Sequence, residues 1–143
     1  MICISWNYRG VGRPRAVRAI RDLIRRENPN LLFLIETKKR DRFMKRLKWK
    51  LGFHNGVFVS ADGTRGGLAL YLKRDVDLSS YSRFHIDVCI EENRVPIWQF
   101  TGFYGAPVEA ESRQGWDMLR LLAGRHNLPW LCSGDFNEIM WRH

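Results

Sequence analysis

Five polar side chains stand at or just beyond the ends of apolar stretches, where a fold could gather them into one site. They are Asn7, Glu36, Tyr104, Asp135 and Asn137. Carboxylate and amide oxygens are the ligands that Mg²⁺ and Mn²⁺ prefer in proteins. The spacing Asp135-Phe136-Asn137 also allows two polar side chains to contact one phosphate or one water. These residue types therefore predict a divalent-cation site, provided that the fold brings the positions together.

Glu36 is the most specific of these positions. It follows residues 31–35, five consecutive apolar residues between turn-forming residues, which predicts a strand buried on both faces. Desolvating a carboxylate at the end of such a strand costs free energy, and a bound cation would offset that cost. The alternative is a structural glutamate that pairs with an arginine or caps the next helix. For Asp135 and Asn137 the alternative is an ordinary Asx turn, and for Tyr104 a core tyrosine.

The elements that must position these residues follow from the apolar spacing. Helices are predicted from Pro14 to about residue 27, over 41–50 and over 108–124. Strands are predicted over residues 1–6, 31–35, 53–60, 67–73, 76–83, 85–91, 96–104 and 128–132, and those between 53 and 104 are expected to form an antiparallel meander. The fold class is α/β or α+β with a mixed sheet. Ligands bind beyond the carboxyl ends of strands in open α/β sheets, so neighbouring strands would bring the polar ends together.

Positive charge is concentrated in the first third of the chain. The net charge is +9, and residues 1–50 hold 15 lysines and arginines against 4 acidic residues. Such an excess favours a polyanionic partner, whereas the alternative is a solvated basic helix face. No Cys/His spacing indicates a zinc site, and no Gly-x-Ser-x-Gly elbow indicates a serine hydrolase. No signal peptide and no apolar run of about 20 residues is present, so we expect a soluble, intracellular protein.

Five motifs, in order, resemble those of the endonuclease/exonuclease/phosphatase superfamily. They are Ser5-Trp6-Asn7-Tyr8-Arg9-Gly10, Phe33-Leu34-Ile35-Glu36-Thr37, Gly66-Gly67-Leu68-Ala69, Thr101-Gly102-Phe103-Tyr104-Gly105 and Gly134-Asp135-Phe136-Asn137. Together they span nearly the whole chain, from Ser5 to Asn137. Their spacing and the Trp-rich context look most similar to the endonuclease domain of plant LINE-type (non-LTR) retrotransposons.

This resemblance implies cleavage of phosphodiester bonds, with Mg²⁺ or Mn²⁺ as cofactor and DNA as the expected partner. It implies that Glu36 binds the metal with Asn7 in or next to its shell. It further implies that Tyr104 contacts the scissile phosphate and that Asp135 orients or deprotonates the attacking water. Asn137 would hold the phosphate.

Arg9, Arg13 and Arg15 are the expected nucleic-acid contacts. Arg9 stands where several DNA-repair members carry an acidic residue, which favours a single metal held by Glu36 and Asn7. The family also makes a nuclear location plausible.

Superfamily members continue for about another hundred residues and carry a C-terminal Ser-Asp-His motif, which His143 does not match. We therefore expect residues 1–143 to form a C-terminally truncated domain. The expected fold is a partial four-layer α/β sandwich: a mixed sheet with flanking helices, the second sheet being largely missing. An uncovered sheet face would make the chain marginal in stability or prone to self-association. Without the His/Asp pair, nuclease turnover is expected to be weak or absent.

Two further functions are compatible with the same residues. One is a remnant that holds nucleic acid through the arginines of residues 9–26 and the basic residues of 38–50 without cleaving it. The other is a superfamily phosphatase acting on inositol phosphates or lipids. The basic N-terminal part and the retrotransposon-like spacing favour DNA, whereas cleavage specificity and the metal's identity are not encoded in the motifs.

Overall fold

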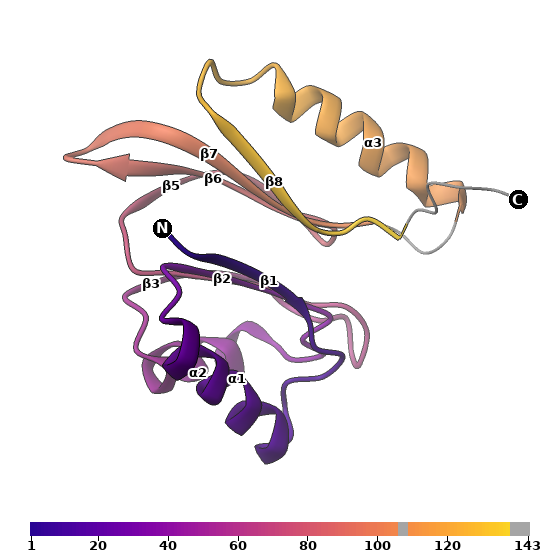
Figure 1. Cartoon of the computed structure of the whole chain (residues 1–143). Helices are drawn as coiled ribbons and strands as arrows, with labels where there is room; N and C mark the ends of the chain where they lie inside the picture. The colour runs from indigo at the N-terminus through magenta and orange to yellow at the C-terminus, as the bar shows by residue number, and fades with distance from the viewer. Residues whose placement is uncertain (106–108, 138–143) are drawn as a thin grey trace, which may run out of the picture.

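The strands of the protein form two four-stranded sheets in a computed structural model that describes residues 1–105 and 109–137 (Figure 1). The first sheet has the order β1-β2-β4-β3. Its strands are β1 (Cys3–Asn7), β2 (Leu31–Ile35), β3 (Asn55–Val59) and β4 (Leu68–Leu72). The second has the order β5-β6-β7-β8, with strands β5 (Val76–Ser82), β6 (His85–Glu92), β7 (Val95–Tyr104) and β8 (Trp130–Asp135).

The helices lie on the outer sides of the sheets. Helices α1 (Pro14–Glu27) and α2 (Asp41–Leu51) cover the first sheet, and α3 (Glu109–Ala123) covers the second (Figure 1). Helix α1 begins with Pro14, whose fixed φ suits a first turn, and ends at Asn28 in the left-handed conformation. It buries Ala16 and Ile20 while its arginines face outward. No helix of the described residues is long and apolar enough to cross a membrane.

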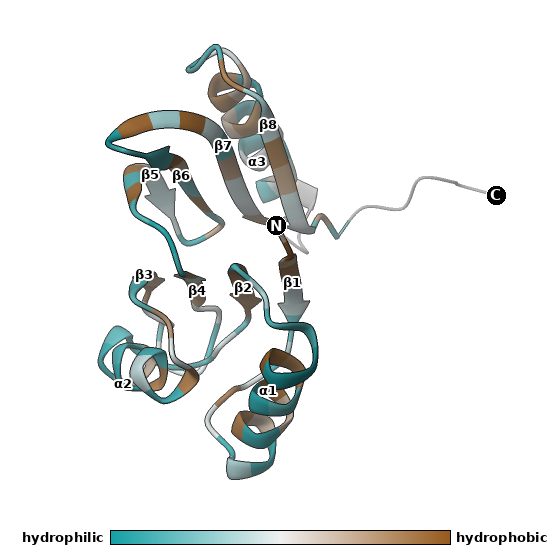
Figure 2. Ribbon diagram, turned by 60° about the vertical axis from the view of Figure 1, so that its left-hand side comes forward, coloured by the Kyte–Doolittle hydropathy of each residue, from teal (hydrophilic) through white to brown (hydrophobic). Residues whose placement is uncertain are grey.

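A continuous apolar core joins the inner faces of the two sheets. Both β2 and β4 are buried along their whole length, which matches their unbroken apolar sequences (Figure 2). Phe33 of β2 meets Phe100 of β7 edge to face, with ring centroids 6.2 Å apart. The buried residues of this core are Leu31, Phe33, Ile35, Leu68, Leu70, Leu72, Ile86, Val88, Ile90 and Phe100.

The mixed α/β class predicted from the sequence is confirmed, but two of its details are wrong. The second sheet is not largely missing, because β5–β8 supply four paired strands whose inner face covers the first sheet. The strands between residues 53 and 104 do not form one meander either. The chain leaves the first sheet after β4 and begins the second at β5, so the expected uncovered face is buried.

Element bounds follow the predictions closely, with one difference that bears on function. The last strand does not end at Cys132 but continues through Gly134 to Asp135, in parallel register with β7. Asp135 is therefore part of the strand and not of the turn after it. The expected start of the last helix at Val108, and His143, lie outside the described residues.

Candidate active site

The polar residues predicted to converge do so where two parallel strand pairs end at the same edge of the molecule. β1 runs parallel to β2, with Asn7 opposite Ile35. β7 runs parallel to β8, with Tyr104 opposite Asp135. Glu36 follows β2 directly, so the strand ends of both sheets deliver their side chains to one region.

Glu36 is held by a tyrosine from the opposite sheet. The Tyr104 hydroxyl donates a hydrogen bond of 2.6 Å to Glu36 Oε1. Burial, reinforced by this carboxylate, raises the pKa of Tyr104 to about 12, so the hydroxyl keeps its proton at neutral pH. Glu36 also has a φ of +55°, a conformation that costs a non-glycine residue free energy and is often found at functional sites.

The other carboxylate oxygen of Glu36, Oε2, lies near the guanidinium group of Arg9. Arg9 Nε lies 3.6 Å from Glu36 Oε2, and the Arg9 side chain is 80% exposed. The sequence analysis named an alternative role for Glu36, a structural glutamate that pairs with an arginine. That pairing is present. An ion pair this exposed contributes little free energy, so Arg9 is free to leave the carboxylate for another anion.

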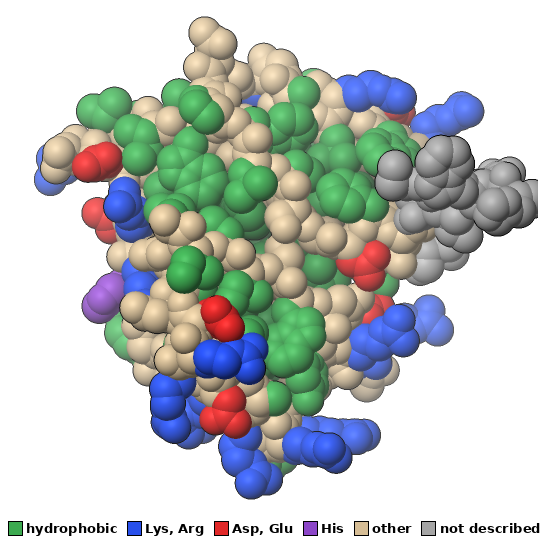
Figure 3. All heavy atoms as spheres, in the orientation of Figure 1, with side chains coloured by type: hydrophobic (Ala, Val, Ile, Leu, Met, Phe, Trp, Pro, Cys, Tyr) green, Lys and Arg blue, Asp and Glu red, His purple; other side chains and the backbone are tan. Residues whose placement is uncertain are grey.

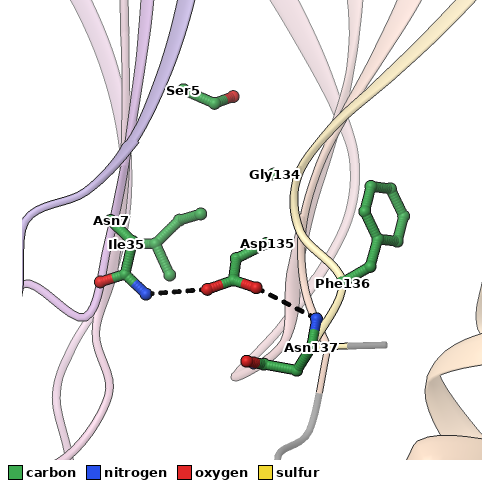
Figure 4. Close-up of a pocket in the computed structure, with 7 residues that line it drawn as sticks. All are labelled: Ser5, Asn7, Ile35, Gly134, Asp135, Phe136 and Asn137. Carbon is green, nitrogen blue, oxygen red and sulfur yellow. Dashed lines mark hydrogen bonds between the residues drawn. The ribbon is translucent and has the colours of Figure 1, made fainter. Parts of the chain in front are cut away.

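Asn7 and Asp135 face each other across the gap between the sheets (Figure 4). Asn7 Nδ2 donates to Asp135 Oδ2 at 3.1 Å. Since a carboxylate only accepts, the amide nitrogen of Asn7 must face it and the amide oxygen must point away. That oxygen, Asn7 Oδ1, is buried and has no hydrogen-bond partner in the described structure. An unmatched buried acceptor is costly and is therefore a place where a ligand is expected.

The second oxygen of Asp135 is fixed by the loop that follows β8. Asn137 N–H donates to Asp135 Oδ1 at 3.0 Å, and Asn137 Nδ2 donates to the Gly105 carbonyl at 2.6 Å. The Asx turn considered from the sequence is therefore present as well, and it orients the carboxylate. Phe136 points away from Asn7 and anchors the loop against Phe103, 5.2 Å between ring centroids (Figure 4).

Asn7, Asp135 and Asn137 line an open cavity of about 650 Å³. Its lining includes Ser5, whose Oγ lies 2.8 Å from Ser133 Oγ and so joins β1 to β8, a pair that the sequence did not single out. Ser5 lies within the predicted strand 1–6, whereas Ser133 directly follows the predicted strand 128–132, and each stands two residues before a polar site residue, Asn7 or Asp135. Their pairing could be found only once β1 and β8 were known to be neighbours.

Two glycines permit the close approach of β7, β8 and the loop after β8. A Cβ on Gly134 would lie 1.9 Å from the Phe103 carbonyl oxygen, and the φ of Gly134 is +151°. A Cβ on Gly105 would lie 2.0 Å from the Phe136 carbonyl oxygen. The glycines of the Tyr-Gly and Gly-Asp motifs are thus required by geometry.

The donors of this region fit a hard divalent cation. They are oxygens: the Glu36 carboxylate, the unmatched Asn7 Oδ1 and, nearby, Asp135. The described residues contain no group of three or more His, Cys, Asp or Glu side chains able to hold a metal. A site with so few protein ligands suits Mg²⁺, which keeps several waters and binds through one or two carboxylates plus substrate phosphates.

Arg13 and Arg15 lie apart from the carboxylates, in a neighbouring basic cavity. That cavity measures about 560 Å³ and is also lined by Arg9, Lys38 and Lys39. Arg9 belongs to both places, since it also contacts Glu36. Positive charge is thus placed next to the polar strand ends.

The fold and the site together define a family. The model of the Endonuclease/Exonuclease/phosphatase family matches residues 4–143, and the chain belongs to that family.

Solved structures agree on the fold. A 3'-5' exonuclease (NExo) from Neisseria meningitidis is 21% identical, with a TM-score of 0.71 over 96% of this chain. Another structure of NExo, described as a 3' phosphatase bound to a product DNA hairpin, is 19% identical over 94% of this chain, with a TM-score of 0.72. An AP endonuclease from Archaeoglobus fulgidus is 18% identical over 96% of this chain, with a TM-score of 0.67. The chain spans 58%, 57% and 58% of these structures respectively. A comparison with curated proteins finds no match.

Proposed function

We propose that this chain carries the cation-binding and water-positioning part of a metal-dependent phosphodiesterase that acts on DNA. The observation that carries the proposal is the meeting of Glu36, Tyr104, Asn7 and Asp135 from four strands of two sheets. Oxygen donors of this kind suit Mg²⁺ or Mn²⁺. When bound, such a cation polarises phosphoryl oxygens and stabilises charge on the leaving oxygen.

Each polar residue of the site has its own proposed role. Glu36 and Asn7 Oδ1 hold the cation. The protonated Tyr104, whose single proton goes to Glu36 in this structure, turns to donate it to a phosphate oxygen when substrate binds. Asp135, held at both oxygens by Asn7 and Asn137, accepts a proton from the attacking water or orients it. Asn137 lines the cavity, and its side chain is proposed to contact the phosphate.

DNA is favoured over inositol phosphates or lipids by the basic cavity beside the site. Arg9, Arg13, Arg15, Lys38 and Lys39 line it, which suits several successive phosphates better than one small headgroup. The Ser5–Gly10 motif resembles that of plant LINE-type retrotransposons, which also has an arginine at the position of Arg9, and this resemblance supports the finer proposal of such an origin. A panel of duplex DNA, inositol phosphate and phospholipid substrates tests this preference.

Residues 1–143 alone are proposed to turn over slowly. No histidine is among the described residues that line the cavity. Loss of one transition-state donor typically costs about 10²–10³-fold in rate. The cation-binding function is proposed to persist, because its donors lie in the chain.

A manganese-binding assay tests the proposed cation binding separately from the proposed slow turnover. We expect the wild-type chain to bind Mn²⁺ in an electron paramagnetic resonance titration. Glu36→Gln should lose most of that affinity, since it removes the charged ligand but keeps the side-chain volume. Asp62→Asn, an exposed carboxylate in a turn, serves as the control. Equal affinity of wild type and Glu36→Gln would contradict the proposed cation site.

Nicking of supercoiled plasmid with Mn²⁺ tests turnover. We expect little nicking by wild type and none above background by Asp135→Asn or Glu36→Gln. Robust nicking that disappears in Glu36→Ala would contradict slow turnover while supporting the assigned site. Nicking equal in wild type and both variants would mean that the site does not cleave DNA.

A further inference from the structure

An exposed tryptophan stands on the outer surface of α2, away from the polar strand ends. The Trp49 side chain is 66% exposed, although a tryptophan ring left in water forfeits a large burial free energy. Its ring does not complete the core beneath α2, which is filled by Met44, Leu47 and Leu51. A single exposed aromatic residue is common on protein surfaces, so the charges around Trp49 decide whether it can serve as a binding surface.

Three cations lie on the same face of the helix as this ring. Arg42, Lys45, Arg46 and Trp49 are spaced i, i+3, i+4 and i+7, which places them on one face, and all are exposed. Lys48 Nζ lies 4.4 Å from the Trp49 ring centroid. Among the described residues, none of these cations is paired with a carboxylate. We call Arg42, Lys45, Arg46 and Trp49 the α2 stripe.

The α2 stripe belongs to a strongly basic side of the molecule. Helices α1 and α2 form one outer layer, and lysines and arginines gather on it at the lower end of the view in Figure 3. This layer lies on the far side of the first sheet from β5–β8. The polar strand ends lie at the edge where β1, β2, β7 and β8 end, so the α2 stripe is a separate surface.

We propose that the α2 stripe binds single-stranded nucleic acid, with a base stacked on Trp49 and phosphates contacted by Arg42, Lys45 and Arg46. An exposed ring flanked by cations offers the two contacts that such binding uses: a stacking platform and a positive track for the backbone. A duplex keeps its bases stacked within the helix, so it can use the cations but not the ring. This surface does not depend on hydrolysis at the candidate active site.

Anisotropy of a fluorescein-labelled oligo(dT) in EDTA measures this binding without any cleavage. Trp49→Ala should weaken it by roughly 5- to 100-fold, the loss expected for one stacked base. Trp49→Phe should recover part of the affinity. Tyr81→Ala removes an aromatic ring that is 64% exposed on β5 and should change nothing. Circular dichroism confirms that each variant is folded, which is expected at exposed positions.

Charge is tested separately from stacking. Lys45→Gln/Arg46→Gln and Arg94→Gln/Arg113→Gln each remove two positive charges from exposed positions, one pair on the α2 stripe and one elsewhere. Only the first should weaken binding. It should also reduce the slope of log affinity against log salt by roughly 1.4, at about 0.7 per phosphate contact on a single strand.

Three outcomes would overturn the proposal. The first is equal affinity of wild type and Trp49→Ala for oligo(dT). The second is an equal loss in both double-charge variants, which would mean a general effect of net charge. The third is stronger binding to a duplex or to anionic vesicles than to oligo(dT), with no contribution from Trp49.

Discussion

At the residue scale, each polar side chain of the candidate site is held by a partner from a distant part of the chain. Glu36 meets Tyr104, and Asn7 meets Asp135. The identities of these residues and their convergence were predicted from the sequence, because each ends an apolar run. The partner of each was not predictable, since pairing depends on which strands are neighbours. The exposed contact of Arg9 with Glu36 is a further detail that spacing could not give.

Gly134 provides a residue-scale prediction. Gly134→Ala should destabilise the protein by more than about 2 kcal/mol, because its Cβ would lie 1.9 Å from the Phe103 carbonyl oxygen. Gly63→Ala is the control: its φ of +61° is also unfavourable, but nothing lies within 4 Å. It should cost only about 1 kcal/mol. Urea denaturation measures both, and equal losses would show that conformation alone, without crowding, limits Gly134.

At the element scale, a buried polar network ties three strands of the second sheet together beneath α3. Asp87 on β6 is fully buried, and its Oδ1 accepts from Thr101 Oγ1 at 2.6 Å and from Gln99 Nε2 at 2.9 Å. Thr101 Oγ1 in turn accepts from Trp130 Nε1 at 2.8 Å. The sequence predicted these strands but not their network. The alternation of polar and apolar residues indicates that one side of a strand is polar. It does not indicate that a helix covers that side.

Thr101→Val tests this network. Valine keeps the shape of threonine but removes the donor to Asp87 and the acceptor of Trp130, so we expect a loss of about 3 kcal/mol. Trp130→Phe leaves the Thr101–Asp87 bond intact and should cost less. The double variant should cost less than the sum, because both substitutions break one shared hydrogen bond. Thermal and urea denaturation measure the three, and strict additivity would argue against a connected network.

His85, at the start of β6, makes stability depend on pH. Its ring nitrogens lie 2.8 Å from Ser80 Oγ and 2.6 Å from Ser82 Oγ. Burial lowers the pKa of His85 below the usual 6.5, and nearby Asp87 only partly opposes this. The unfolded chain therefore takes up a proton near pH 6.5 that the folded chain resists. Stability should fall as pH drops below about 6.5 and level off below the folded pKa.

Urea denaturation at pH 7.5, 6.5 and 5.5 measures this dependence. The slope of unfolding free energy against pH should approach, at most, about 1.4 kcal/mol per pH unit for this one group. His85→Asn should remove that slope, whereas His54→Asn, at an exposed position, should keep it. An unchanged slope in His85→Asn would assign the dependence to other groups.

At the scale of the whole molecule, the two sheets pack face to face. On one side of the molecule, the outermost strand of each sheet has no further strand paired with it. β1 ends the first sheet and β8 ends the second, and the Ser5–Ser133 hydrogen bond places them side by side. The sequence led us to expect an uncovered sheet face. The apolar surface lies instead along this edge, where Ile2, Trp130 and Leu131 are 46%, 38% and 42% exposed. Figure 3 shows hydrophobic side chains over this side.

Open strand edges with apolar side chains favour pairing with a second copy of the chain, because unpaired backbone groups act as a template for another strand. We therefore predict concentration-dependent self-association in sedimentation velocity. Leu131→Lys should shift the population towards monomer, since a lysine on an edge strand disfavours pairing and opposes burial. Leu121→Lys provides the matched control, because Leu121 is 67% exposed on α3, away from β1 and β8. A wild-type chain that stays monomeric at high concentration would contradict the prediction. An equal shift in both variants would mean that general solubility, and not this edge, controls association.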